Sequence, residues 1–102
     1  MSEHKLCKTT DIPEGTAQQF EIDDELIAVC NIHGEFFAIS DICSHAHAHL
    51  SEGQIHDCKI VCPLHGAEFD IKTGKALKMP AVASIPIYPL RIDGNEIKIM
   101  VE

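Results

Sequence analysis

Short runs of branched and aromatic apolar residues, separated by turn residues, dominate the hydrophobic pattern of the chain. Residues 26–32 and 35–39 are two such runs, and only His33 and Gly34 lie between them. A two-residue connection between apolar runs is typical of a tight β-hairpin, in which a glycine supplies the positive φ. The pattern therefore predicts a hairpin over residues 26–39, with Gly34 in the turn.

A second hairpin is predicted near the end of the chain. Residues 88–92 and 96–101 are apolar runs joined by the turn sequence Asp93-Gly94-Asn95. Alternate positions of the last run are apolar and should share one face of a strand: Ile97, Ile99 and Val101. Shorter strands are expected at residues 4–8, 16–22, 53–56, 59–61 and 68–71.

Helical periodicity is weak, and prolines keep residues 80–89 from forming a helix or a central strand. The 102 residues are enough for one domain of about 100–200 residues. An apolar content of 45% with 24% charged residues is typical of a globular chain. The sequence therefore predicts a single all-β domain, a small sandwich or barrel of antiparallel strands.

The charge of the chain argues against two classes of partner. Sixteen acidic residues against eight Lys and Arg give a formal charge of -8, which repels nucleic acid and anionic membranes. No apolar run approaches the roughly 20 residues of a membrane-spanning helix. The start of the chain, Met1-Ser2-Glu3-His4-Lys5, lacks the features of a signal peptide. We therefore expect a cytoplasmic protein.

Two stretches of the chain concentrate side chains that bind metals. Cys43 and His45 have one residue between them, Cys62 and His65 have two, and sixteen residues separate the pairs. Five cysteines in a reducing compartment do not suggest a disulfide framework. Two neighbouring strands between the pairs would return the second loop beside the first, so that both pairs point to one metal centre.

With these spacings the chain resembles the Rieske iron–sulfur family, whose pattern is C-x-H followed by C-x-x-H. More narrowly, it resembles the free-standing Rieske ferredoxins of aromatic-ring dioxygenase systems. The resemblance covers nearly the whole chain and rests on these segments: Cys43-Ser44-His45, Leu50-Ser51-Glu52-Gly53, Cys62-Pro63-Leu64-His65-Gly66 and Phe69-Asp70-Ile71-Lys72-Thr73-Gly74-Lys75.

The resemblance implies one Rieske-type [2Fe–2S] cluster, with Cys43 and Cys62 on the inner iron and His45 and His65 on the outer iron. It also implies an all-β, Rieske-type antiparallel β-sandwich over residues 1–102, with a cluster-binding subdomain inserted at about residues 40–80. The implied function is one-electron transport, without catalysis, from an NAD(P)H-dependent flavoprotein reductase to a terminal Rieske non-haem iron oxygenase acting on aromatic compounds. A monomer suits such a carrier.

The sequence departs from the respiratory and photosynthetic branch of the family. Ala48 and Leu64 stand where that branch has two further cysteines joined in a disulfide, and Ala67 and Phe69 stand where it has hydroxyl donors to the cluster. With fewer donors, the reduced cluster is less stabilised. We therefore expect a reduction potential at the low end of the Rieske range, about -150 mV.

Three other interpretations of the motif remain open. Two cysteines and two histidines also make a Cys2His2 zinc site, which would indicate a zinc-stabilised interaction module. The fold could instead belong to the small subunit of another oxidoreductase, such as nitrite reductase. A nucleophilic Cys62–His65 pair is the third, although no orienting carboxylate or oxyanion-hole signal accompanies it.

Several neighbouring residues receive simpler interpretations. His47 and His49 are expected to be surface histidines, and Gly66 to serve the turn and let backbone N–H groups approach the cluster. The remaining thiols are expected to be non-ligating and mostly partly buried: Cys7, Cys30 and Cys58. Some of the acids that flank the two loops could form an acidic rim that steers docking: Asp41, Glu52, Asp57, Glu68 and Asp70.

Overall fold

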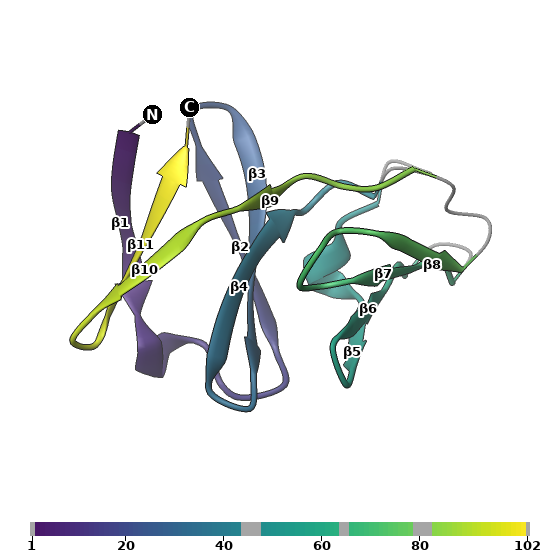
Figure 1. The fold of residues 1–102 in the computed structure, drawn as a ribbon, viewed down its shortest axis with the longest axis horizontal. Helices are drawn as coiled ribbons and strands as arrows, with labels where there is room; N and C mark the ends of the chain where they lie inside the picture. Colours follow the sequence, from purple (N-terminus) through teal and green to yellow (C-terminus); the bar gives the residue numbers. More distant parts are fainter. Residues whose placement is uncertain (1, 44–47, 64–65, 79–82, 102) are drawn as a thin grey trace.

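The computed structural model describes residues 2–43, 48–63, 66–78 and 83–101, which form three antiparallel sheets (Figure 1). The outer sheet has the order β1 (Ser2–Lys8), β11 (Glu96–Val101), β10 (Leu90–Asp93). The central sheet has the order β2 (Ala17–Ile22), β3 (Glu25–Ile32), β4 (Glu35–Ser40), β9 (Ile87–Tyr88). The small sheet has the order β5 (Gln54–His56), β6 (Lys59–Val61), β7 (Glu68–Asp70), β8 (Ala76–Lys78).

Strand β3, inside the central sheet, is buried on both faces. Ile27 and Val29 belong to one buried cluster, together with Ile97 and Ile99 of the outer sheet. Ala28 and Cys30 belong to a second buried cluster, which also contains these residues of the small sheet: Ile60 and Phe69. A strand covered on both faces reads as a continuous apolar run, which explains the uninterrupted sequence Leu26-Ile27-Ala28-Val29-Cys30. The all-β prediction is confirmed, as three layers with β3 in the middle.

The first predicted hairpin is confirmed. β3 and β4 pair antiparallel from Ile27 opposite Ser40 to Ile32 opposite Glu35. The two turn residues both have positive φ, 52° at His33 and 90° at Gly34. This is the conformation of the tight turn whose twist matches that of the strands.

The second predicted hairpin forms, but its first strand is interrupted. Residues 87 and 88 pair with β4, whereas residues 90–93 pair with β11. Pro89 lies between the two segments and has no N–H to donate, so the chain changes partner there. The prediction of one strand over residues 88–92 was therefore wrong. In β11 the predicted apolar face is confirmed: Ile97, Ile99 and Val101 are buried.

The shorter strands predicted from the sequence appear as β1, β2, β5, β6 and β7. The sequence did not predict β8 or the two 3-10 turns, η1 (Thr9–Asp11) and η2 (Leu50–Glu52). β8, with the sequence Ala-Leu-Lys, contains no β-branched or aromatic residue, so its composition gives no strand signal. Within the described ranges, no helix has the length and apolar character needed to cross a bilayer.

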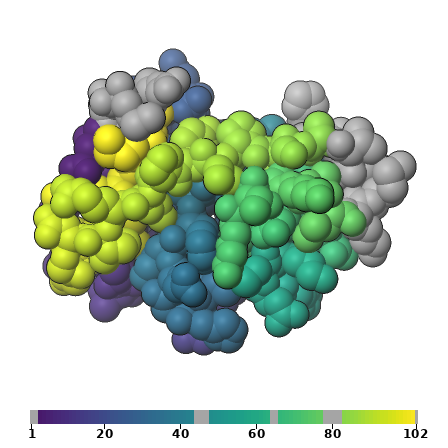
Figure 2. Space-filling model, viewed as in Figure 1, coloured from purple at the N-terminus to yellow at the C-terminus, as the bar shows by residue number. Residues whose placement is uncertain are grey.

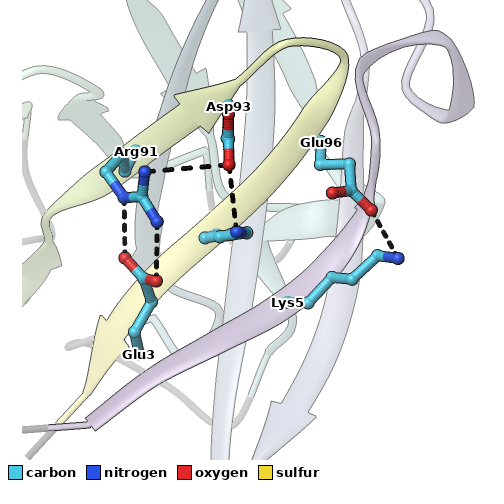
Figure 3. Close-up of polar contacts among 6 residues, drawn as sticks. Glu3, Lys5, Arg91, Asp93 and Glu96 are labelled. Carbon is cyan, nitrogen blue, oxygen red and sulfur yellow. Dashed lines mark hydrogen bonds and ion pairs between the residues drawn. The ribbon is translucent and has the colours of Figure 1, made fainter.

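Basic residues of the outer sheet are held in local ion pairs (Figure 3). Arg91 donates from Nε and Nη2 to the two carboxylate oxygens of Glu3, at 2.8 Å each. These hydrogen bonds hold the pKa of Glu3 below its usual value. Two further pairs lie beside it: Lys98 with Asp93, and Lys5 with Glu96. Positive charge on this sheet is therefore compensated locally.

Candidate metal centre

The first predicted ligand loop is closed at its base by backbone contacts. The chain leaves β4 at Ser40, and Ile42 forms an isolated antiparallel bridge with His49. One step further in, the N–H of Cys43 donates to the carbonyl of Ala48 at 3.0 Å. These contacts fix Cys43 at the root of the loop.

The second predicted ligand loop connects β6 to β7 and is closed in the same way. The N–H of Cys62 donates to the carbonyl of Ala67 at 2.7 Å, so in each loop a cysteine bonds to an alanine five positions later. Gly66 has a φ of 72°, a conformation that a side chain disfavours. The expectation that Gly66 serves the turn is confirmed. Both loops are closed by the same type of backbone hydrogen bond, from the N–H of the cysteine to the carbonyl of the alanine.

Both cysteines point into the protein. Cys43 is 3% exposed and Cys62 is 1% exposed, and both belong to the buried cluster shared by the central and small sheets. All five cysteines lie in the described part of the chain, and none is in a disulfide. His45 and His65, the other two predicted ligands, lie outside the described residues, as does His47. Among the described side chains alone, no three His, Cys, Asp or Glu residues form a metal site.

The two loops are brought together by a backbone contact at Gly53, just after η2. A Cβ added to Gly53 would lie 1.8 Å from the carbonyl oxygen of Val61 and 3.3 Å from that of Leu50. Val61 directly precedes Cys62. Gly53 has a φ of -85°, which any residue adopts, so its lack of a side chain matters here for space. The chain returning from the first loop thus rests on the strand that leads into the second.

Asp41 lies at the foot of the first loop and is completely buried, with 0% exposure. Its Oδ1 accepts the N–H of Ser51 at 2.7 Å, and its Oδ2 accepts the side-chain amide of Gln19 at 2.5 Å. Its backbone N–H donates to the carbonyl of Leu26, and its own carbonyl accepts the N–H of Leu50. Asp41 was placed in a candidate acidic rim from the sequence, and this was wrong, because a buried carboxylate cannot meet a partner.

This arrangement of two cysteine loops corresponds to a known family. The model of the Rieske [2Fe-2S] domain matches residues 2–89. The chain belongs to this family.

Several proteins similar to this Rieske chain are ferredoxin components of dioxygenases. It is 45% identical over 92 residues to the 3-phenylpropionate/cinnamic acid dioxygenase ferredoxin subunit of Shigella boydii serotype 4 (strain Sb227), covering 89% of this chain and 86% of that one. It matches the ferredoxin of carbazole 1,9a-dioxygenase from Nocardioides aromaticivorans IC177 with a TM-score of 0.96, 30% identity and full coverage of both chains. A ferredoxin in complex with the oxygenase of carbazole 1,9a-dioxygenase matches with a TM-score of 0.90 and 28% identity, covering 95% and 91%. The chain is a Rieske ferredoxin, an electron-transfer component rather than an enzyme.

The described residues fit a Rieske cluster. Such a cluster needs two thiolates at one iron, away from water, and Cys43 and Cys62 are two buried, unbridged thiols at matching loop roots. Ala67 and Phe69 are fully buried and carry no hydroxyl that could donate to a cluster sulfur. Ala48, also buried, occupies one of the two positions where the respiratory branch has its bridging cysteines.

The other thiols of this Rieske domain differ in burial. Burial, with a smaller contribution from the negative charge of Asp41, raises the pKa of the Cys30 thiol to about 12. Cys7 and Cys58 are partly buried, as expected, whereas Cys30 is fully buried. A thiol with such a pKa is fully protonated at neutral pH, and therefore unreactive.

His49 is more than the surface histidine that the sequence suggested. Its side chain is 41% exposed, and its Nδ1 lies 3.1 Å from Oδ2 of Asp41 and 3.0 Å from Nε2 of Gln19. The side chain is on the surface, as expected, and β2 and the loop root in addition supply it with specific neighbours. Gln19 lies 22 residues from Asp41 and carries no motif, so sequence reasoning could not have found this contact.

Proposed function

We propose that this Rieske ferredoxin accepts single electrons from an NAD(P)H-dependent flavoprotein reductase and delivers them to a terminal Rieske non-haem iron oxygenase that attacks aromatic compounds. The observation that carries the proposal is the likeness, along nearly the whole of both chains, to a ferredoxin subunit of an aromatic-acid dioxygenase. The pairing with an oxygenase is supported by the ferredoxin–oxygenase complex of carbazole 1,9a-dioxygenase.

Four residues would hold the cluster. In this proposal Cys43 and Cys62 bind the inner iron, and His45 and His65 bind the outer iron. When bound, the group supplies a one-electron couple, in which one of two ferric irons becomes ferrous. The two cysteines lie at buried loop roots, so the iron that they bind would be kept away from water. Ile42, next to Cys43, is 37% exposed and lies on the surface beside the loop root.

The donor set alone also fits zinc, and the fold alone also fits a small subunit of nitrite reductase. The family match favours iron over zinc. The relative with 45% identity is a ferredoxin subunit, which favours the dioxygenase carrier over the nitrite reductase subunit. We further infer that residues 1–102 act as one Rieske domain, with the cluster-binding part at about residues 40–80, and that the protein works as a monomer in the cytoplasm.

The reduction potential is expected near the low end of the Rieske range, about -150 mV. The physical reason is that Ala67 and Phe69 offer no hydroxyl to stabilise the extra negative charge of the reduced cluster. A redox titration followed by visible absorbance measures this potential. Ala67→Ser should raise it, since a serine can donate a hydrogen bond. A clearly positive potential in the unmodified protein would contradict the argument.

Electron delivery should also respond to salt. No Lys or Arg occurs in residues 9–58, and Glu52, on η2 after the first loop, is exposed. Asp57 does not belong to the face that carries Glu52, because it lies in the β5–β6 turn beside Glu14 and His33. A basic partner would therefore be steered toward this face, and screening would slow the encounter. In a reconstituted assay with reductase, oxygenase and an aromatic substrate, oxygenase turnover should require this protein and fall as ionic strength rises.

Two results of that assay would count against the proposal. Turnover that proceeds equally well without this protein would refute its role as the carrier. Turnover that needs the protein but does not change with salt would refute the steering by acidic residues and leave the carrier role intact. Glu52→Gln, which removes one exposed charge, is the matched variant for the steering effect.

A further inference from the structure

Asp41 is a buried carboxylate whose side-chain partners come from three parts of the chain. Ser51 of η2 donates to Oδ1, Gln19 of β2 donates to Oδ2, and His49 lies within hydrogen-bonding distance of Oδ2. Hydrogen bonds to a charged acceptor are stronger than those between neutral groups, which is how a carboxylate can be kept in an apolar interior. The hydrogen bonds to the Asp41 carboxylate thus offset the free-energy cost of removing its charge from water.

Three side-chain atoms around Asp41 lie within hydrogen-bonding distance of one another. Oδ2 of Asp41, Nε2 of Gln19 and Nδ1 of His49 lie 2.5, 3.0 and 3.1 Å from one another. With a proton on Nδ1, His49 donates to Asp41 and its N–H faces the amide of Gln19; without that proton, Nδ1 accepts from Gln19 and faces a lone pair of Asp41. In either tautomer a neutral His49 leaves the charge of the carboxylate in place.

Among the described residues, no Lys or Arg side chain lies beside Asp41 to neutralise its carboxylate charge. His49 is the ion-pair partner of Asp41 among the described side chains, and no Lys or Arg is paired with it. The sequence from residue 9 to residue 58 contains neither Lys nor Arg. A buried charge without a fixed counterion acts on its neighbours over several ångströms, because the interior screens weakly.

The position of Asp41 places this charge beside one of the two loops. It lies two residues before Cys43, whereas the equivalent position before Cys62 is the fully buried, apolar Ile60. Asp41 already disfavours negative charge on a nearby sulfur, since it contributes to the raised pKa of the Cys30 thiol. Cys30, Cys43 and Cys62 all belong to one buried cluster.

We propose that Asp41, held by Gln19, His49 and Ser51, is a residue of this chain that lowers the reduction potential of the cluster. Reduction adds one negative charge to the group bound by the first loop, and a fixed anion at the root of that loop opposes the addition. The effect acts from within the protein and adds to the low potential expected from the missing hydroxyl donors. This inference rests on the proposed function, because it requires a cluster at Cys43 and Cys62.

The test compares two substitutions that each remove one negative charge. Asp41→Asn keeps the shape and one acceptor oxygen of the buried side chain, and Glu52→Gln removes a charge that is exposed on η2, next to Ser51. In redox titrations followed by visible absorbance, Asp41→Asn should shift the potential upward by several times the shift of Glu52→Gln. Equal shifts in the two variants, or a downward shift in Asp41→Asn, would overturn the proposal.

A second variant keeps the test decisive if Asp41→Asn does not retain its cluster. Gln19→Met removes a donor from Asp41 with little change in side-chain volume, and Gln19 lies on the surface. With less compensation a charged Asp41 opposes reduction more strongly, so the potential should fall; a rise would mean that the carboxylate has taken up a proton and lost its charge. An unchanged potential in Gln19→Met would refute the proposal. Unmodified protein without iron would instead refute the proposed function, so the two failures are distinguishable.

Discussion

Replacing either Cys43 or Cys62 with serine should remove the red-brown visible absorbance and leave the purified protein without two irons and two acid-labile sulfides per chain. Each cysteine is buried at the root of its loop, and a serine hydroxyl is a far weaker ligand for iron than a thiolate. Absorption spectra with iron and sulfide analysis measure the loss. Cys58→Ser is the matched control, because Cys58 is a partly buried thiol that packs against the same cluster of side chains.

The same measurement separates the proposed ligands from their neighbours. His45→Ala and His65→Ala should also lose the cluster, whereas His47→Ala should retain it. Loss of the spectrum in Cys58→Ser, or in His47→Ala with the fold intact, would show that the ligand set was misassigned. One zinc per chain in the unmodified, colourless protein would establish the zinc site instead.

Gly53→Ala should destabilise the protein by about 3 kcal/mol and disturb the cluster, although it adds a single methyl group. The added Cβ would lie 1.8 Å from the carbonyl oxygen of Val61, a backbone atom that cannot rotate away. The strand that carries Val61 into Cys62 must therefore move. Thermal unfolding should show a melting temperature lower by roughly 12 °C or more, since 1 kcal/mol corresponds to about 4–8 °C in a domain of this size.

Gly94→Ala is the control for this substitution. Gly94 has a φ of 65° with open space around its Cβ position, so alanine there meets only the unfavourable backbone conformation. It lies in the turn between β10 and β11, and its replacement should cost stability without changing the visible spectrum. If Gly53→Ala retains both the spectrum and the melting temperature of the unmodified protein, the close approach of Gly53 to the backbone of Val61 does not hold the second loop in place.

Features that depend on local sequence were predicted well. The hairpin of β3 and β4 follows from two apolar runs and a His-Gly turn, because a two-residue connection allows few alternatives. The positions of the two cysteine loops follow from motif spacing: the first follows β4 and is closed by the bridge between Ile42 and His49, and the second connects the paired strands β6 and β7. The uninterrupted apolar run of β3 also indicates burial on both faces, which was not predicted from the sequence.

Features that depend on contacts between distant segments could not be predicted. Gln19 reaches Asp41 across 22 residues, and nothing in the local sequence of either residue indicates the other. Asp41 looked like a surface acid because acids are rarely buried, and only its partners explain the exception. Gly53 was expected at the start of a short strand, and nothing in its local sequence indicates that it allows the close approach of a backbone from another strand.

The shared central sheet has a consequence for how the protein can acquire its inorganic cofactor. The chain ends are held in the outer sheet, by the pairing of β1 with β11, and that sheet packs on one face of β3 through its own set of side chains. The cysteine loops depend on the set at the opposite face. Opening of the side of β3 that carries the cysteine loops, to admit iron and sulfide, would therefore leave the paired chain ends in place.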